Sequence, residues 1–215
     1  AYAEDPPDSG VVTVDSFEAL EEAQGNEAVT KIIFNGSDGL VIAGFFVLHK
    51  DLEIQSTLIV ANYSVFIIDG CVLTLNGDTE TGEGARITNR GVIVNGETGN
   101  MTNNGIMMFI APASITNNGN VINNSEIWLV DKLAGAGGYE GNELASWEDG
   151  PTAISPSDFI YAADVSTEAA LLYAMASSDY AEIWLSDLGD TYDAEGNFIS
   201  GVGITLSVAA LEGSN

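Results

Sequence analysis

The sequence predicts a mainly β protein, in which a parallel β-solenoid is capped by short helices. An apolar-Thr-Asn-(Asn/Arg)-Gly motif starts at Ile87, Met101 and Ile115, so each copy begins at the fourteenth position after the previous one. Short runs rich in Val, Ile, Leu and Phe alternate with turn residues between positions 39 and 76, and no helical periodicity lasts beyond a first short helix. A fixed repeat of this size around an Asn-Gly turn is typical of stacked coils of short strands.

Composition narrows the class of protein. The chain has 215 residues, 46% of them hydrophobic, and a formal net charge of −27. The five cationic residues are Lys31, Lys50, Arg86, Arg90 and Lys132. So acidic a surface repels phosphate backbones and anionic lipids, which argues against nucleic-acid binding, and no apolar run is long enough for membrane insertion. The opening AYAEDPPDSG, without a methionine, predicts a mature secreted protein, located outside the cell or on its surface.

The first part of the chain predicts an extended arm, a strand, a helix and a second strand. Residues 1–14 form the arm and, from Val11 to Val14, the strand. Asp15 to Glu18 has capping-box spacing and opens a helix from Phe17 to about Gln24. A strand at Lys31–Phe34 follows. Residues 15–131 together are predicted to form the helix-capped solenoid, in which the single cysteine, Cys71, is a small core residue.

The repeated motif predicts ladders of stacked side chains. If each repeat is one coil, the threonines stack in one column and the asparagines in another, where each amide hydrogen-bonds the same residue one coil away. The glycines would supply a positive φ at a sharp corner. The predicted structural ladder comprises Thr88, Asn89, Gly91, Thr102, Asn103, Gly105, Thr116, Asn117 and Gly119. Because so short a coil is thin, the alternative is that the repeat is a local spacing within larger, irregular coils.

The second part of the chain contains an internal duplication. Residues 132–156 are rich in Gly and acidic residues and predict a linker. Beyond it, Val165–Leu171 aligns with Val14–Leu20 at an offset of 151, and Glu182–Leu185 then falls on Lys31–Phe34 without a gap. Residues 157–215 therefore predict a second, truncated unit that begins with a helix capped near Ser166 and continues with strands.

The short strands and the turns TNRG, TNNG and NNS resemble the pectate-lyase-like right-handed β-helix superfamily of secreted bacterial and archaeal proteins, over roughly residues 30–130. That resemblance implies lyases or polygalacturonases, which need a basic residue beside an acidic calcium cluster, or an Asp-Asp pair with a nearby His. Arg86 and Arg90 are the only arginines, there is no Asp-Asp dipeptide, and the single histidine, His49, lies outside the repeats. We therefore expect a protein that is not an enzyme, and His49 to be a strand histidine.

Metal and sugar binding are the remaining chemical hypotheses. One glycine-containing loop gathers oxygen ligands of the kind Ca²⁺ prefers: Asp187, Asp190, Asp193, Glu195 and Asn197. A solvated acidic hairpin loop is the alternative. Asp78, Glu80 and Glu83 form a second, smaller acidic group. Polysaccharide binding would use aromatic residues, namely Trp128, Tyr139, Trp147, Trp184 and Tyr192, although Trp128 and Trp184 lie in strand-like EIW segments.

The predicted function is that of an extracellular structural protein, a self-assembling subunit of a filament, sheath or surface layer. A solenoid ends in a row of unpaired backbone groups, which must be covered or paired with another chain. The predicted assembly interface comprises Val11, Val12, Val14, Ile204, Leu206 and Val208. The alternative is a monomeric polysaccharide-binding or adhesin module on the cell surface, and a degraded lyase is a third possibility.

Overall fold

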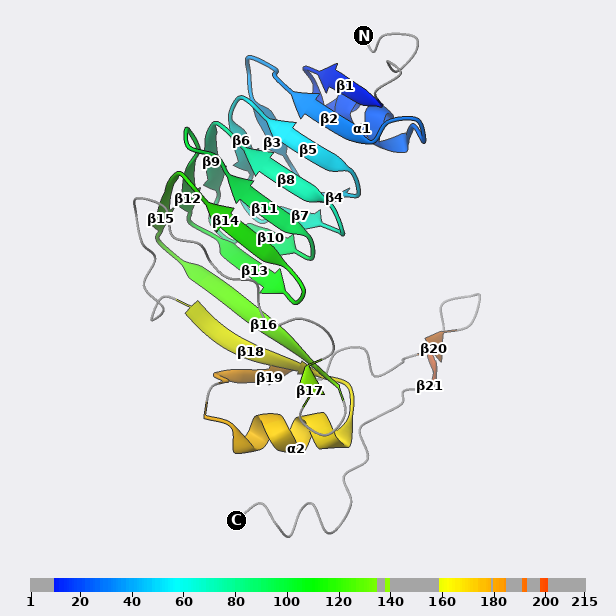
Figure 1. Cartoon of the computed structure of the whole chain (residues 1–215), viewed down its shortest axis with the longest axis vertical. Helices are drawn as coiled ribbons and strands as arrows, with labels where there is room; N and C mark the ends of the chain where they lie inside the picture. Colours follow the sequence, from blue (N-terminus) through cyan, green and yellow to red (C-terminus); the bar gives the residue numbers. More distant parts are fainter. Residues whose placement is uncertain are drawn as a thin grey trace.

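The computed structural model describes residues 10–134, 138–139, 159–178, 180–184, 191–192 and 198–200. They form a parallel β-solenoid of about seven turns with two short helices, which confirms the predicted fold class. The strands stack along the long axis of the molecule into three parallel sheets, so each turn has three sides (Figure 1). Helix α1 (Phe17–Gly25) lies at one end of this stack and α2 (Glu168–Ala176) lies beyond the other.

Within the complete turns of the solenoid, each sheet takes one strand from every turn. Sheet A contains, in spatial order, β1 (Val11–Val14), β2 (Lys31–Phe34), β5 (Asp51–Ile54), β8 (Val72–Leu75), β11 (Val92–Asn95) and β14 (Ser114–Asn117). Sheet B contains β3 (Leu40–Ile42), β6 (Leu58–Val60), β9 (Asp78–Thr81), β12 (Asn100–Asn103) and β15 (Asn120–Asn123). Sheet C contains β4 (Phe45–Leu48), β7 (Val65–Ile68), β10 (Arg86–Asn89), β13 (Ile106–Ile110), β16 (Glu126–Ala134), β18 (Phe159–Val165) and β19 (Glu182–Trp184).

Three further short strands lie off this plan. Strand β17 (Gly138–Tyr139) pairs antiparallel with the far end of β16. Strands β20 (Thr191–Tyr192) and β21 (Phe198–Ser200) pair antiparallel with each other. Strand β16 continues to Ala134, so regular structure reaches three residues into the stretch that the sequence predicts to be a linker.

The strand register shows that a turn is much longer than the repeated motif. Ile87 is paired with Phe66 on one side and Met107 on the other, and Met101 is paired with Val121. The side-chain bonds between neighbouring turns from Asn95 to Asn117 and from Asn103 to Asn123 accordingly join residues 22 and 20 positions apart. The interval between two copies of the motif therefore spans two of the three sides of a turn. The prediction that each repeat is one coil is wrong, and the alternative, a local spacing within larger coils, is confirmed.

Buried and outward side chains alternate along the short strands, and the buried ones form the core. Most four-residue strands bury their second and fourth side chains, which point into the solenoid because successive side chains point to opposite faces of a strand. The buried apolar side chains form one continuous cluster from Val12 to Ile127. Strand β9 follows the same pattern without apolar residues, since it buries Thr79 and Thr81. Cys71 is buried in this core, as predicted.

Helix α1 covers the first turn. The Oγ of Ser16 caps its N-terminus by accepting from the backbone N–H of Ala19. On its inward face, the side chains of Leu20 and Ala23 are fully buried. The side-chain amide of Gln24 links the helix to β4, because its Nε2 donates to the carbonyl oxygen of Val47 at 2.8 Å. The apolar face of α1 thus closes the end of the core, as the sequence predicts.

Asparagine amides at the corners hydrogen-bond from one turn to the next. The side chain of Asn103 is fully buried. Its Nδ2 donates to Oδ1 of Asn123 at 2.8 Å and to the carbonyl oxygen of Glu126 at 3.1 Å. Its Oδ1 accepts from Oγ1 of Thr81 at 2.8 Å and from the N–H of Gly105 at 3.2 Å. One amide therefore satisfies polar groups on three turns that would otherwise be buried without partners.

The three copies of the motif lie on three different sheets, in β10, β12 and β14. Thr88, Thr102 and Thr116 therefore do not stack on one another, and neither do Asn89, Asn103 and Asn117. The predicted columns are wrong, because the true stacking partners lie one whole turn apart. Ladder bonds do form, but between other pairs, such as Nδ2 of Asn95 to Oδ1 of Asn117 at 2.8 Å.

The glycines of the motif, Gly91, Gly105 and Gly119, serve a different purpose from the one predicted. None of them has a positive φ. A Cβ at each would instead overlap the carbonyl oxygen one turn earlier, that of Cys71, Ala85 or Gly99. These positions need glycine because two turns of backbone approach closely at the corner.

We predict that Asn103→Ala lowers the free energy of unfolding by about 3 kcal/mol, because several buried hydrogen bonds lose one partner. Thr102→Ala, on the outward side of the same strand, serves as the control and should cost about 0.5 kcal/mol. Urea unfolding followed by circular dichroism measures both values. Equal losses in the two variants would contradict a structural role for the buried amide.

Candidate functional site

The two helices belong to two copies of one strand–helix–strand unit, at opposite ends of the stack. In the first unit Ser16 caps α1 through the N–H of Ala19. In the second unit Thr167 caps α2 through the N–H of Ala170, and both residues lie at the offset of 151 that aligns the two copies. The cap is thus Thr167 rather than its neighbour Ser166. The predicted internal duplication holds at the level of individual hydrogen bonds.

The strands of the two units match in the same way. Strands β1 and β2 are parallel, with Val11 opposite Lys31. Strands β18 and β19 are parallel, with Ala162 opposite Glu182, and this pair lies at the same offset from the first. The same unit is therefore built twice, and the second copy serves as an internal reference for the first.

The second unit is joined to the solenoid through its first strand. Strand β18 pairs in parallel with β16 over seven residues, from Ile127 opposite Phe159 to Leu133 opposite Val165. The equivalent strand of the first unit, β1, is the end strand of sheet A among the described residues, and β19 is the end strand of sheet C. These two end strands lie toward opposite ends of the long axis (Figure 1).

The outer edge of β1 presents the backbone of Thr13. The carbonyl oxygens of Gly10 and Val14 accept from Lys31 and Asn35, so these residues direct their backbone groups toward β2. Backbone direction alternates along a strand, and Thr13 therefore directs its N–H and C=O to the outer edge. Its counterpart in the second unit, Asp164, lies on β18 opposite Lys132 of β16. The outer edge of β1 is therefore equivalent to the edge through which β18 pairs with β16 at the end of the solenoid.

The predicted interface residues divide into three groups. Val12 and Val14 are buried in the core, at 7% and 4% exposure, so their side chains face the core and only their strand's backbone edge can meet a partner. Val11 is half-buried. Ile204, Leu206 and Val208 lie outside the described residues.

The outward face of sheet B carries polar ladders. Nδ2 of Asn120 donates to Asn100 at 2.8 Å, and Nδ2 of Asn100 donates to Asp78 at 3.0 Å. A parallel series runs from Asn124 through Asn104 to Glu80, at 2.9 and 3.3 Å. Asp78 and Glu80, two carboxylates of the predicted smaller acidic group, are thus the final acceptors of these two series of hydrogen bonds between strands. This structural role explains their positions.

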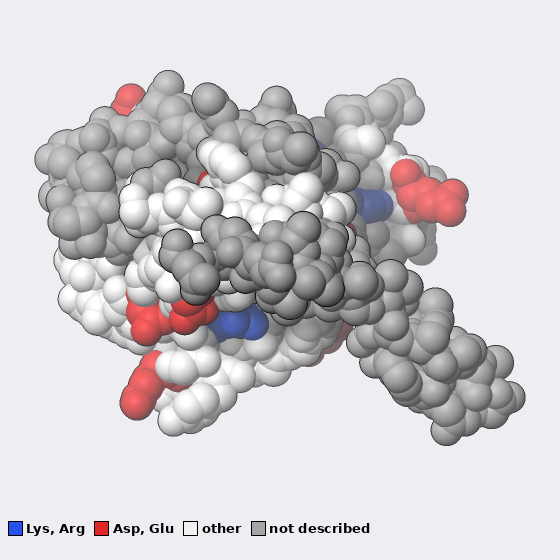
Figure 2. Space-filling model, turned by 90° about the horizontal axis from the view of Figure 1, so that it is seen from below, with Lys and Arg blue, Asp and Glu red and all other residues white. Residues whose placement is uncertain are grey.

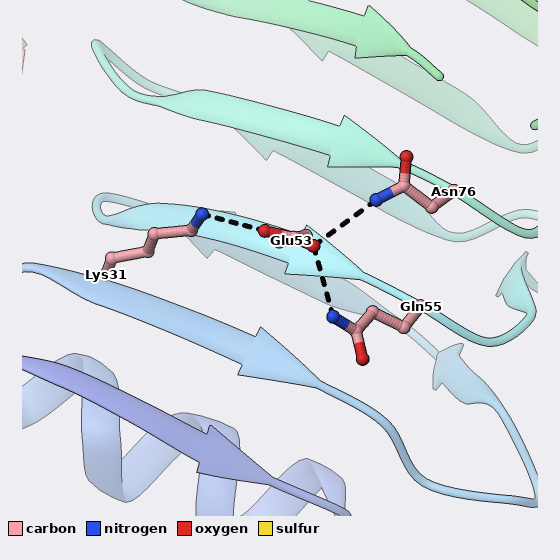
Figure 3. A network of polar contacts seen from close by, with 4 residues as sticks. All are labelled: Lys31, Glu53, Gln55 and Asn76. Carbon is pink, nitrogen blue, oxygen red and sulfur yellow. Dashed lines mark hydrogen bonds and ion pairs between the residues drawn. The ribbon is translucent and has the colours of Figure 1, made fainter. Parts of the chain in front are cut away.

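A similar network crosses the outward face of sheet A around Glu53 (Figure 3). Lys31 Nζ lies 2.7 Å from Glu53 Oε2, while Gln55 and Asn76 donate to Oε1 at 3.1 and 3.3 Å. The bond from Lys31, then that from Gln55, holds the pKa of Glu53 below its ordinary value. One of the five cations is therefore committed to tying β2 to β5.

The inner amide ladder of sheet A ends at β14. Asn95 donates to Asn117, but Nδ2 of Asn117 is buried and has no hydrogen-bond partner among the described residues. An acceptor from a further turn would satisfy this donor.

The aromatic residues predicted to bind sugar have another role where they are described. The rings of Trp128 and Trp184 lie 5.6 Å apart, and both pack on the buried side chains of a small cluster on sheet C. Each indole N–H donates to the glutamate two residues earlier, Glu126 or Glu182, at 2.8 Å. These two EIW segments thus fasten the second unit to the solenoid. For Tyr139 and Tyr192 the structure describes only the strand, and Trp147 lies outside the described residues.

Two of the candidates for catalysis, His49 and Arg90, follow the aligned ends of β4 and β10 at one corner, with Asp69 on the turn between them. Cys71 lies near the same corner, since its Sγ donates to the carbonyl oxygen of Leu48 at 3.4 Å. His49 is at a corner rather than in a strand; its Nδ1 is 3.5 Å from Asp69, and its side chain is 58% exposed. Arg86 and Arg90 are exposed near the two ends of β10. Burial raises the pKa of the Cys71 thiol to about 11, so the thiolate form is scarce at neutral pH.

The predicted calcium loop, Asp187, Asp190, Asp193, Glu195 and Asn197, lies outside the described residues. Within the described part of the chain, no three His, Cys, Asp or Glu side chains come together in a way that could hold a metal ion. No described helix is long and apolar enough to cross a membrane.

A buried carboxyl group lies at the junction between the solenoid and the second unit. Asp131, on β16, is 6% exposed and accepts a hydrogen bond from the hydroxyl of Tyr180 at 3.0 Å. Burial raises its pKa, and the bond from Tyr180 partly opposes that shift. The sequence carries no signal for this group, since its burial depends on the docking of the second unit.

Comparison of the chain with protein-family models, with curated proteins and with solved structures gave no significant match. The class of the molecule, a three-sided parallel β-solenoid with a duplicated strand–helix–strand unit, therefore rests on its own geometry.

We predict that Asp131→Asn stabilises the protein at neutral pH. Because the native pKa is raised, the folded chain holds this proton more tightly than the unfolded chain, and ionisation above the native pKa costs stability. That cost shrinks as the pH falls through the native pKa toward the ordinary value near about 4. Unfolding measured across this range should show the advantage of the variant at neutral pH and its loss in acid.

Tyr180→Phe is the matched control for this pH effect. It removes the hydrogen bond to the ionised carboxylate and should lower stability at neutral pH more than in acid. A pH-independent difference between wild type and Asp131→Asn would contradict the raised pKa.

Proposed function

We propose that this protein is a secreted structural protein, a rod-shaped subunit of an extracellular filament, sheath or surface layer. Subunits join head to tail when β19 of one copy pairs in parallel with β1 of the next. The observation that carries the proposal is the contact between β16 and β18, in which the first strand of one unit is seated on the end of a solenoid. Since β1 holds the same place in its own unit, it is built for a contact of the same kind.

Helix geometry supports this arrangement. In a continued sheet β18-β19-β1-β2, each helix would lie mainly over its own pair of strands, although α2 also contacts β16, the strand before its pair. The two helices would then be two strand spacings apart, about 10 Å, which is the usual distance between packed helices. In this arrangement α2 of one copy and α1 of the next would pack side by side.

The charge of the chain supports a location outside the cell and a role for cations. A net charge of −27 makes subunits repel one another, and divalent ions would reduce that repulsion. We include calcium at the predicted loop, residues 187–197, as part of this proposal. No step of the proposed assembly needs catalysis.

A monomeric polysaccharide-binding or adhesin module is the second candidate, and Tyr63 favours it. Tyr63 has a φ of 59° and is 76% exposed. The turn one rung later holds Gly84, with a φ of 66°, at the matching position. A side chain in this conformation costs about 1 kcal/mol. An exposed ring kept at a strained position is a candidate for contact with a sugar face.

Negative-stain microscopy of the full chain, with and without about 1 mM Ca²⁺, tests the proposal. We expect filaments or sheets from the wild type. Thr13→Pro should abolish them, because proline removes the outward N–H of β1 and leaves the pairing with β2 intact. Thr13→Val keeps that N–H and should assemble like the wild type.

Two results would contradict head-to-tail docking. Uniform monomers of the wild type at high concentration would exclude it and leave the sugar-binding candidate. Filaments from Thr13→Pro that match those of the wild type would show that the β1 edge is not used.

A further inference from the structure

The outward faces of the two matching helices differ in chemical character. At positions 18, 21, 22 and 24, helix α1 carries Glu, Glu, Glu and Gln. At the matching positions of the second unit, helix α2 carries Ala, Leu, Tyr and Met. We call Ala169, Leu172, Tyr173 and Met175 the α2 outer face. The inward positions hardly differ, since Ala19, Leu20 and Ala23 correspond to Ala170, Leu171 and Ala174. The change is therefore largest on the side that faces away from the sheet, at positions 18, 21 and 22 of α1. The two helices also differ at their first position, Phe17 against Glu168, and at Gln24, whose amide reaches β4.

Part of the α2 outer face is open to solvent. Tyr173 is 42% exposed and Met175 is 56% exposed, while Ala169 and Leu172 are half-buried. Within α2 the single charged residue is Glu168, at its first position. In the view from below, the end that carries α2, much of the described surface has neither acidic nor basic groups (Figure 2). A helix that is apolar on both faces is normally covered on both.

Growth of the solenoid beyond β19 would leave most of this face uncovered and would reach only Met175, because the matching Gln24 bonds to β4 of the following turn. In the first unit a complete stack follows β2, and Glu21 and Glu22 remain exposed. Leu172 and Tyr173 hold the same two positions, so they would remain uncovered even if further strands were added. The partner must approach α2 from outside the stack.

We propose that the α2 outer face binds the same face of a second copy, so that two α2 helices pack across a two-fold axis. Two chains of charge −27 attract each other only through surfaces that carry little charge, and this face is one. An apolar helix face of this kind is self-complementary under two-fold symmetry. This contact lies beside the strand contact proposed above and does not depend on it; together they pair one filament with another.

The contact is small. Two nine-residue helices bury much less than the about 1,600 Å² of a standard interface, so we expect a reversible dimer. Sedimentation velocity of the chain carrying Thr13→Pro, which should not form filaments, over a concentration series at about 0.15 M salt measures its dissociation constant.

The first test transfers the residues of α1 to α2, as Leu172→Glu, Tyr173→Glu and Met175→Gln in one chain. The helix tolerates such residues, because α1 has them at the same positions. We expect the dissociation constant to rise at least about tenfold. The control, Ala28→Glu with Ala43→Glu, adds the same charge at exposed positions on the other end of the molecule. An equal rise in the control, or a Thr13→Pro chain that stays monomeric up to about 100 µM, would overturn the proposal.

The second test detects the proposed contact by disulfide cross-linking and does not rely on substitutions that weaken it. Tyr173→Cys places a thiol close to the proposed axis, and Glu22→Cys places one at the matching position on α1. Under mild oxidation we expect covalent dimers from Tyr173→Cys and monomers from Glu22→Cys; the buried thiol of Cys71 should not compete. Equal cross-linking of the two variants would overturn the proposal even if the first variant fails to fold.

The two proposals fail independently. Dimers without filaments would reject strand docking and keep the α2 contact. Filaments of unchanged width in the variant carrying the α1 residues would reject the α2 contact and keep strand docking. Capture of the α2 outer face by a different protein, with no wild-type dimer, counts against the proposal.

Discussion

Parallel pairing of each strand with its equivalent in the next turn is the constraint on which the rest of this structure depends. It brings backbone from successive turns so close at the corners that only glycine fits at Gly91, Gly105 and Gly119. It also removes the corner groups from water, so they need partners. The buried amide of Asn103 supplies several of them at once. Close stacking and amide ladders are therefore one feature: the first creates the buried polar groups and the second satisfies them.

A stack of parallel strands leaves unpaired backbone groups at each end. The two ends of this molecule differ in how they are covered. At the first end, α1 closes the core with Leu20 and Ala23 and presents three glutamates to solvent. At the other end of the described structure, sheets A and B stop at β14 and β15, whereas sheet C continues through β18 and β19. There the last amide, that of Asn117, lacks a partner among the described residues, and the second helix is apolar on both faces. The groups available for contact with another chain are thus found mainly at this end of the molecule.

Much of this architecture follows from the sequence, because its signals are local. The alternation of short apolar runs, the cap at Ser16 and the internal duplication were each sufficient to predict the element found. The length of a turn was not predictable in the same way. The repeated motif is equally compatible with a two-sided coil and with two sides of a three-sided one, and only the register of β10, β12 and β14 decides between them. The burial of Asp131 and the stacking of Trp128 on Trp184 depend on how the second unit docks, which no local pattern encodes.

A double-mutant cycle tests the three-sided turn most directly. Asn103 and Asn123 lie one turn apart and share a hydrogen bond, whereas Asn103 and Asn89 lie one motif apart and belong to different sheets. Alanine substitutions, singly and in pairs, give the coupling energy of each pair from unfolding free energies. We expect about 1 kcal/mol for the first pair and no more than about 0.3 kcal/mol for the second. Coupling between Asn103 and Asn89, with none between Asn103 and Asn123, would contradict the account.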